Sequence, residues 1–545
     1  MNRRKFLQTT ALGLAQATVI CPAFKVLTSS LAVAAPWRRS FEWEEATLAD
    51  LQAAMKARQE SAVSLVKKYL RRIEEVDRRG PAINAIIQLN PDAVAIAREL
   101  DQERRARGPR GPLHGIPVLI KDNIDTHDRM MTTAGSLALL GSIPPRDAFV
   151  AQKLREAGAV LLGKTNLSEW ANFRSTRSTS GWSGRGGLTR NPYALDRNPS
   201  GSSSGTGAAV AANLCAVGLG TETDGSIASP SSCNGLVGLK PTVGLVSRAG
   251  IIPIAHSQDT AGPMARTVTD AAILLGALTG IDQRDLATEK GAGRGPADYT
   301  SFLEPDGLRG VRLGVARQFF ELQPGAKKVA EAALEALRSC GAILVDPADI
   351  PTNGKFSDSE DLVLQYEFKS DLNAYLAGLG PWAPVKTLQD LIEFNERNRD
   401  REMPFFGQEL FLKAQARGPL TDQAYVEALE KNHRLSRDEG IDAVMNEHRL
   451  AAMVSPTTGP APRTDLVYGD RDTGGCTTPA AVAGYPHITV PAGEVFGLPV
   501  GLSFFGRAFS EPTLLKCAFA FEQATKARKA PRFLPTLMEG KSLSR

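Results

Sequence analysis

Residues 115–125 read GIPVLIKDNID, in which a short apolar run over residues 117–120 ends on a lysine. Such a run, bounded by turn residues, predicts a buried strand. A helix is expected over residues 148–157, with Gly158 as its stop, followed by a second strand over residues 159–162. Strands that alternate with helices are typical of an α/β fold.

The same alternation continues towards both ends of the chain, so one sheet is expected to take strands from both. Residues 47–50 (TLAD) have the form of a helix capping box. Residues 358 to about 446 have a helical pattern with few strand candidates and are interpreted as an insertion, and residues 289–297 as a glycine-rich loop. Further strands are expected at residues 311–315, 342–345, 451–455, 487–490 and 500–505, and further helices at residues 61–73, 326–339 and 511–525.

Length and composition exclude several classes of protein. The chain has 545 residues, of which 42% are hydrophobic and 23% charged, enough to bury a large core, so a disordered chain, collagen and a disulfide-stapled miniprotein are excluded. The net charge of +5 includes four basic residues of the first 35, a stretch without acidic residues: Arg3, Arg4, Lys5 and Lys25. Without them about +1 remains, and we expect no nucleic-acid partner.

The first 35 residues resemble a twin-arginine export signal. Residues 2–7 read NRRKFL, a weakly apolar run follows, and residues 32–34 (AVA) fit a signal peptidase site. Residues 6–24 contain too many polar residues to span a bilayer, so no stable membrane anchor is expected. The sequence therefore predicts a leader over residues 1–35, transient contact with the export machinery, and a periplasmic or secreted protein of residues 36–545.

The cysteines and histidines give no pattern of a disulfide framework or a metal site. Beyond the leader the cysteines are five in number and widely spaced, and they are expected to act as small buried hydrophobes. The six histidines include no obvious catalytic base and, with the cysteines, no metal-ligand spacing. The cysteines are Cys215, Cys233, Cys340, Cys476 and Cys517.

Residues 198–240 are the segment richest in groups that could take part in a reaction. In this segment Gly, Ser and Thr surround one apolar run. A phosphate-binding loop would need a Gly-Lys-Ser or Gly-Lys-Thr ending, which residues 205–207 (GTG) lack. A nucleophile elbow matches residues 201–205 (GSSSG), but residues 196–200 make a poor strand before it. Ser64 and Lys67 match Ser-x-x-Lys only on a charged helix surface.

A lysine can replace histidine as the base. Lys121 follows the expected strand at residues 117–120, and burial there would lower the pKa of its amine. A lysine that extends to the surface is an equal alternative on this segment alone.

Five blocks in order resemble the amidase signature family, most closely its bacterial peptide amidases. The resemblance covers roughly residues 45–275 and 450–525. It implies an α/β/α sandwich with a large mixed central sheet covered by helices, in one catalytic domain over residues 36–545, with no cofactor and no metal. The blocks are residues 115–125, 163–166 (GKTN), 201–205 (GSSSG), 220–227 (GTETDGSI) and 238–242 (GLKPT).

The same resemblance assigns a Ser-Ser-Lys triad. It makes Ser226 the nucleophile, Ser202 the bridging serine after a cis peptide from Gly201, and Lys121 the base. The backbone N–H groups of Thr223, Asp224, Gly225 and Ser226 would form the oxyanion hole. Supporting roles are expected for Gly201, Ser203, Asp122 and Asn123.

The implied activity is hydrolysis of a carboxamide to a carboxylic acid and ammonia through an acyl-enzyme, with peptide C-terminal amides as the first expected substrates. Aryl, fatty or N-acyl amides remain open, as do a non-catalytic periplasmic binding protein and one component of a glutamine-dependent amidotransferase. Many relatives have Gly at position 224 and Arg at position 228, where this chain has Asp224 and Ala228. The peptide amidases share the Asp, so we expect the chemistry to be kept.

Overall fold

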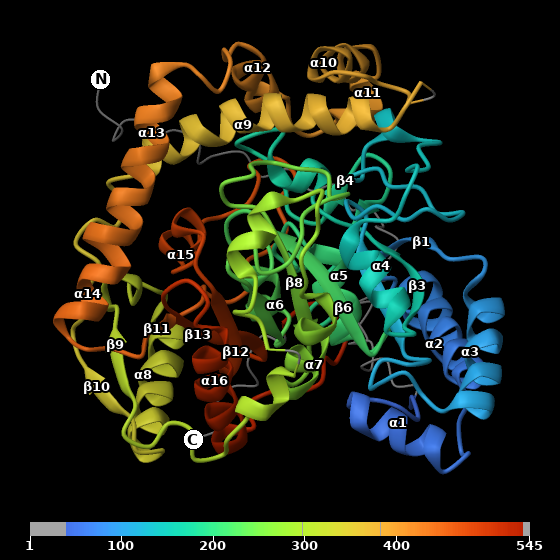
Figure 1. Cartoon of the computed structure of the whole chain (residues 1–545), viewed down its shortest axis with the longest axis horizontal. Coiled ribbons are helices and arrows are strands. Elements are labelled where there is room, and N and C mark those ends of the chain that lie inside the picture. The colour runs from blue at the N-terminus through green and yellow to red at the C-terminus, as the bar shows by residue number, and fades with distance from the viewer. Residues whose placement is uncertain (1–39, 297, 382, 538–545) are drawn as a thin grey trace, which may run out of the picture. The chain divides into compact units, whose positions relative to one another are not determined.

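A computed structural model of the chain describes residues 40–296, 298–381 and 383–537; the predicted leader lies outside them. Within the described residues one mixed sheet has eleven strands in the order β1-β3-β2-β6-β8-β7-β12-β13-β11-β9-β10 (Figure 1), and β4 pairs with β5 separately. The strands are β1 Ile86–Leu89, β2 Pro117–Lys121, β3 Val160–Thr165, β4 Trp182–Ser183, β5 Gly187–Leu188, β6 Val217–Glu222, β7 Val237–Lys240, β8 Thr260–Ala265, β9 Arg312–Val315, β10 Ile343–Val345, β11 Ala452–Pro456, β12 His487–Val495 and β13 Leu498–Phe505.

The sheet takes strands from both ends of the chain, as predicted. β2 lies between β3 and β6 and is parallel to both, whereas β8 runs antiparallel to β6. β12 and β13, from the C-terminal part, pair with β7 and β11 in the same sheet. β2 therefore ends inside the sheet, with a parallel neighbour on each side.

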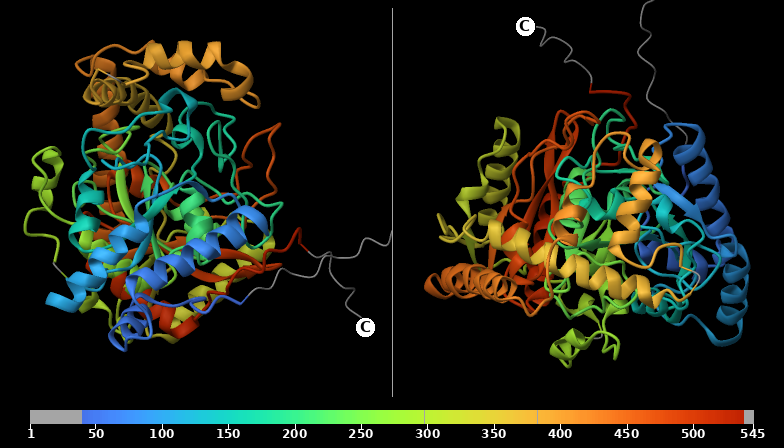
Figure 2. Two further views of the ribbon diagram at one scale, coloured as in Figure 1. Left: turned by 90° about the vertical axis from the view of Figure 1, so that its right-hand side faces the viewer. Right: turned by 90° about the horizontal axis from the view of Figure 1, so that it is seen from above.

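Helices cover both faces of the sheet (Figures 1 and 2). They are α1 Leu48–Lys56, α2 Ala62–Ile73, α3 Ala93–Arg107, α4 Phe149–Glu156, α5 Ser204–Ala211, α6 Ala228–Cys233, α7 Val268–Leu278, α8 Pro324–Ser339, α9 Ser357–Gly378, α10 Leu388–Arg397, α11 Arg399–Glu402, α12 Glu409–Gln415, α13 Gln423–His433, α14 Asp442–Glu447, α15 Thr478–Ala483 and α16 Glu511–Thr525.

The side chains of β2 alternate between two apolar cores. Val118 and Ile120 belong to the core formed with α4, α7, α8 and α16. Leu119 belongs to the core formed with α2, α3 and α5. Successive side chains of a strand point to opposite faces, so Lys121 points to the α5 face together with Leu119. This arrangement confirms the predicted α/β/α layering.

Most predicted boundaries agree with the structure within a few residues. Thr47 caps α1 through the expected capping box with Asp50, and α16 spans the predicted residues. The prediction for residues 289–297 was wrong in part, because a 3₁₀ helix, Leu286–Gly291, reaches into the expected loop. Its first turn is stabilised by Asp285, whose side chain accepts the N–H of Ala287.

Helices α9 to α14 lie between β10 and β11 in sequence, and no strand occurs among the described residues of this stretch. In the right view of Figure 2, α9 crosses over the body of the protein. Phe368 of α9 packs in an apolar cluster with Trp170 and Phe173. α9 is thereby fixed against the segment that follows β3.

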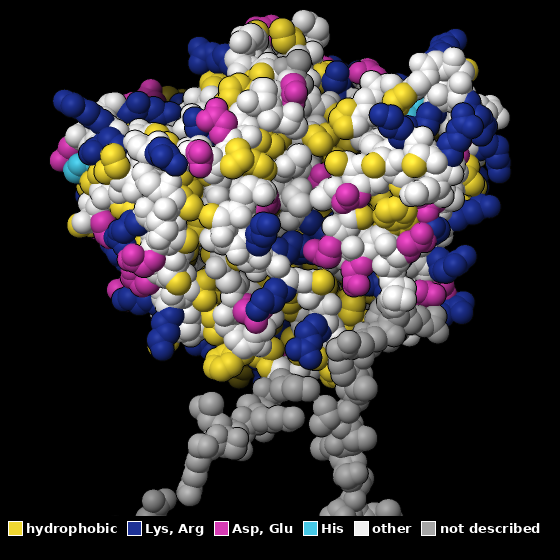
Figure 3. Space-filling view, turned by 90° about the horizontal axis from the view of Figure 1, so that it is seen from below, with side chains coloured by type: hydrophobic (Ala, Val, Ile, Leu, Met, Phe, Trp, Pro, Cys, Tyr) yellow, Lys and Arg dark blue, Asp and Glu magenta, His cyan; other side chains and the backbone are white. Residues whose placement is uncertain are grey.

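Charged side chains of both signs are mixed on the face drawn in Figure 3. Lys and Arg do not form a continuous stripe there. Among the described residues, no helix combines the length and the apolar character needed to span a bilayer.

Candidate active site

Lys121 lies at the end of β2 with its side chain fully buried. Its Nζ donates hydrogen bonds to Ser202 Oγ at 2.7 Å and to Thr221 Oγ1 at 2.9 Å. Thr221 comes from the parallel neighbour β6, and Ser202 from the loop that leads into α5. The lysine therefore does not extend to the surface, and the alternative of a solvated amine is excluded.

Burial lowers the pKa of Lys121 from its usual 10.5 to about 7. The negative charges of Asp259 and Glu222 oppose this shift but do not cancel it. A lysine with such a pKa is partly neutral near pH 7, and its free amine can then accept a proton from the hydroxyl in contact with it.

Ser202 is buried and follows a cis peptide bond from Gly201, as the resemblance implied. A Cβ on Gly201 would lie 2.3 Å from Ser168 Oγ and 2.7 Å from Ser180 Oγ, so only glycine fits without movement. The carbonyl of Ser202 accepts the N–H of Ser168 at 3.1 Å. The serine is thus fixed from both sides of its own backbone.

Ser226 lies in the turn between β6 and α6, with 8% of its surface exposed. Gly225 before it has a φ of 74°, a conformation that favours glycine. After it, the Glu222 carboxylate accepts the N–H groups of Ile227 at 2.7 Å and Ala228 at 2.9 Å. The turn is therefore held by a buried carboxylate from the end of its own strand.

The backbone joins the serine segments directly. The N–H of Ser203 donates to the carbonyl of Ser226 at 3.2 Å. The hydroxyl of Ser203 donates to the Thr221 carbonyl at 3.0 Å and accepts the Thr221 N–H at 3.2 Å. The structure thus brings Lys121 and Ser202 into contact. Ser203, which follows Ser202, is hydrogen-bonded to Ser226.

The two polar residues after Lys121 also have defined partners. The Asp122 carboxylate pairs with Arg185 at 3.2 Å and accepts a hydrogen bond from Thr133. Asn123 Nδ2 donates to Thr221 Oγ1 at 3.0 Å. Asp122 is thus bound on the side of Arg185 and Thr133, whereas Asn123 also lines the cavity described below.

Sequence reasoning missed Thr221 and Asp259. Thr221 contacts Lys121 through its hydroxyl, and Asp259 accepts the hydroxyl of Thr223 at 2.5 Å. Thr221 lies inside the quoted GTETDGSI block, but a threonine in such a block gives no signal of its partner. Asp259 follows the apolar and polar residues IIPIAHSQ, and only the fold shows that it reaches the turn before Ser226.

The departure at position 224 is accommodated by two threonines. The Asp224 carboxylate accepts hydrogen bonds from Thr477 Oγ1 at 2.7 Å and Thr478 Oγ1 at 2.6 Å. These threonines stand at the start of α15. Ala228 is fully buried, and its side chain provides no anchoring group.

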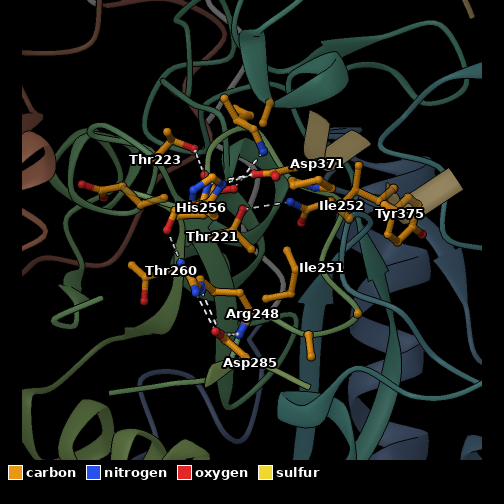
Figure 4. Close-up of a pocket in the computed structure, with 18 of the residues that line it drawn as sticks. Thr221, Thr223, Arg248, Ile251, Ile252, His256, Thr260, Asp285, Asp371 and Tyr375 are labelled. Carbon is orange, nitrogen blue, oxygen red and sulfur yellow. Dashed lines mark hydrogen bonds and ion pairs between the residues drawn. The ribbon is translucent and has the colours of Figure 1, made fainter. Parts of the chain in front are cut away.

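A cavity of about 330 Å³ is lined in part by Thr223 (Figure 4). This volume lies within the range of small-molecule sites. Its lining is apolar at Ile251, Ile252 and Ile254 and charged elsewhere. The charged lining residues are Glu222, Arg248, His256, Asp259, Arg284, Asp285 and Asp371.

One group of side chains has the spacing of metal ligands. Among the described residues, His256, Glu367 and Asp371 offer ligand atoms within 4.8 Å of one another. The His256 ring nitrogens lie 2.8 Å from Asp371 and 3.4 Å from Glu367. In this structure the histidine forms ion pairs with both carboxylates.

Comparison with known proteins identifies relatives over most of the chain. The amidase family model matches residues 64–515. A probable amidase of Arabidopsis thaliana is 44% identical over 504 residues, which are 91% of this chain and 93% of the plant protein. One component of the glutamyl-tRNA(Gln) amidotransferase of Thermoanaerobacter pseudethanolicus is 35% identical, over 89% of this chain and 98% of its own.

Among solved structures, the native peptide amidase of Stenotrophomonas maltophilia superposes with a TM-score of 0.86 and 51% identity, covering 91% of this chain and all of that one. The match includes both the central sheet and the helices that cover it. The chain therefore belongs to the amidase family and is an amide-hydrolysing enzyme.

Proposed function

We propose that this enzyme hydrolyses carboxamides with Ser226 as nucleophile, Ser202 as proton bridge and Lys121 as base. The observation that carries the proposal is the 2.7 Å contact between a fully buried lysine amine and the Ser202 hydroxyl. A backbone hydrogen bond from the next residue, Ser203, to Ser226 supports the second half of the relay.

In the proposed reaction, neutral Lys121 accepts the proton of Ser202, and Ser202 takes the proton of Ser226. Ser226 Oγ then bonds to the amide carbon, and the carbonyl electron pair moves to oxygen. Backbone N–H groups of residues 223–226 would stabilise this oxyanion, where one lost donor typically costs ~10²–10³ in rate.

The tetrahedral intermediate collapses as the C–N bond breaks. The departing nitrogen takes the proton returned along the relay and leaves as ammonia or an amine. Water then loses a proton to the same relay and attacks the acyl-enzyme. The carboxylic acid leaves, and Ser226 regains its proton.

Peptide C-terminal amides are the substrates that we favour. The support is the 51% identity to a peptide amidase and the cavity beside Thr223, which has room for a small side chain and an apolar wall to receive it. Aryl, fatty and N-acyl amides are the competing classes within the same chemistry.

Ammonia release by the purified mature chain tests this proposal, on a panel of amidated dipeptides, aryl amides and fatty amides. We expect amidated dipeptides to have the highest kcat/KM, and Ser226→Ala to remove turnover. Turnover of free glutamine only with partner proteins would support an amidotransferase component, as in the 35% identical relative. Binding without turnover of any amide would support a non-catalytic binding protein.

We further propose that residues 1–35 direct twin-arginine export to the periplasm or beyond. The support is the arginine pair Arg3-Arg4 before an apolar run. Replacing both arginines by lysine keeps the charge, and we expect precursor to accumulate in the cytoplasm. Equal export of the two forms in a fractionation experiment would exclude this route.

A further inference from the structure

Three acidic residues of α9 lie on one face of that helix. Glu360, Glu367 and Asp371 are separated by seven and four residues, spacings that place side chains on the same side of a helix. Glu367 is fully buried, and Glu360 is 8% exposed. In Figure 1, α9 runs along the top of the molecule, above the sheet.

Each of these acids binds the loop formed by residues 254–259, here called the site loop. Glu360 accepts a hydrogen bond from Gln258 Nε2 at 3.1 Å. Glu367 accepts the N–H of Ser257 at 2.9 Å, and Asp371 accepts the N–H of His256 at 3.0 Å. Three consecutive residues of the loop are therefore bound by one helix.

The site loop in turn binds the residue that begins the proposed oxyanion turn. Gln258 Nε2 also donates to the carbonyl of Thr223 at 3.3 Å. Asp259 accepts the Thr223 hydroxyl at 2.5 Å, and its other oxygen accepts the N–H groups of Ile254 and Ala255 at 2.8 and 2.9 Å. Thr223 is thereby held through both its carbonyl and its side chain.

We infer that α9 positions the oxyanion turn through the site loop, with Glu360, Gln258 and His256 as positioning residues for amide hydrolysis. This inference rests on the proposed function, because it assumes that the N–H groups of residues 223–226 face the oxyanion. A shift of the Thr223 carbonyl would rotate the following peptide units and misalign these donors. Transition-state stabilisation depends steeply on that alignment.

His256 of the site loop forms ion pairs with Asp371 and Glu367 of α9. Its Nδ1 lies 2.8 Å from Asp371 and its Nε2 3.4 Å from Glu367 (Figure 4). Burial alone would lower the pKa of His256, but the hydrogen bond to Asp371 and the charge of Glu367 outweigh it and raise that pKa. The positive charge of Arg248, whose guanidinium binds the His256 carbonyl, acts in the opposite direction.

Glu367 and Arg248, which lie beside His256, each have a further polar partner. Tyr425 of α13 donates its hydroxyl to Glu367 Oε1 at 2.8 Å. Arg248 pairs with Asp285 at 2.6 Å. The raised pKa means that His256 keeps its positive charge to a higher pH than an ordinary histidine.

The first test compares substitutions at Glu360. Glu360→Ala removes the acceptor for Gln258, and we expect kcat to fall about tenfold with little change in KM. Burial and the charge of Asp224 raise the pKa of Glu360 to about 8, so the carboxyl is largely protonated at neutral pH. Glu360→Gln, which is similar to the protonated form and keeps an acceptor oxygen, should recover most of the loss.

Asp358→Asn is the matched control, since this exposed acid of the same helix lies outside the contacts with the loop. Its kcat should equal that of the wild type. A Glu360→Ala enzyme with wild-type kcat would overturn the inference, as would an equal loss in the Gln and Ala variants at unchanged melting temperature.

The second test removes the contacts of the His256 ring. His256→Asn loses the contacts with Asp371 and Glu367, and we expect kcat to fall roughly two- to fivefold with little change in KM, since the pair is partly exposed. His448→Asn is the control and should keep the wild-type kcat. A His256→Asn enzyme with wild-type kcat would exclude His256 from this role.

Failure of this inference can be told from failure of the proposed function. If wild-type Ser226 does not react with a serine-directed reagent, the nucleophile assignment is wrong. The positioning role of α9 is then rejected with it. If Ser226 reacts and Glu360→Ala reacts at the same rate, only the role of α9 is rejected. If Glu360→Ala reacts more slowly and Glu360→Gln does not, both stand.

Discussion

At the scale of single residues, the chemistry of Lys121 follows from its position. It is the last residue of a strand that has parallel neighbours on both sides, so its amine is enclosed by Thr221 and Ser202 instead of water. Desolvation then favours the neutral amine.

The pH dependence of kcat/KM tests this assignment. In the proposed mechanism activity requires neutral Lys121, so it should fall below about pH 7, approaching tenfold per pH unit at lower pH. A carboxyl such as Asp259, whose pKa burial raises to about 6, could give a similar limb. The two are distinguished by temperature, because the apparent pKa of an amine falls on warming whereas that of a carboxyl hardly changes.

Circular dichroism over the same pH range serves as the control for unfolding. A limb that does not move with temperature, or a flat profile down to about pH 5, would be inconsistent with a lysine base.

At the scale of elements, α5 begins two residues after the proposed bridging serine, and its second residue, Gly205, has no space for a side chain. A Cβ on Gly205 would lie 2.4 Å from the carbonyl oxygens of both Ala85 and Asn166. These are backbone atoms of neighbouring segments and cannot rotate away. The close approach fixes the direction in which Ser202 points relative to β2.

Gly205→Ala should therefore destabilise the fold by about 1–3 kcal/mol and lower activity more than the loss of folded protein explains. Urea unfolding measures the first effect, and kcat per folded enzyme the second. Gly111→Ala is the control, because a Cβ at Gly111 has no atom within 4 Å. Equal unfolding midpoints for the two variants would show that the contact is not as tight as described.

The sequence predicted the elements whose pattern is local. The apolar run at residues 117–120 and the helical periodicity of residues 511–525 became β2 and α16. It did not predict β8, because TAGPMA has a glycine, a proline and no β-branched run after Thr260. That strand forms because β6 and β7 lie on either side of it.

At the scale of the whole molecule, the site combines segments that are distant in sequence. The strand end at Lys121 was predicted from its apolar run, and the roles of the serine loop at Ser202 and the turn at Ser226 were predicted through family resemblance. The contacts of Thr223 with Gln258 and Asp259, and of the site loop with α9, were not predictable. They depend on where a helix from residues 357–378 is placed, which no local pattern encodes.

The most direct test of the account is the identity of the residue that becomes acylated or sulfonylated. The wild-type enzyme is treated with a serine-directed sulfonyl fluoride and digested, and the modified peptide is sequenced by mass spectrometry. We expect one adduct, on Ser226, that is absent in Ser226→Ala and forms much more slowly in Lys121→Ala. An adduct on another residue, or one that persists in Ser226→Ala, would contradict the proposed relay.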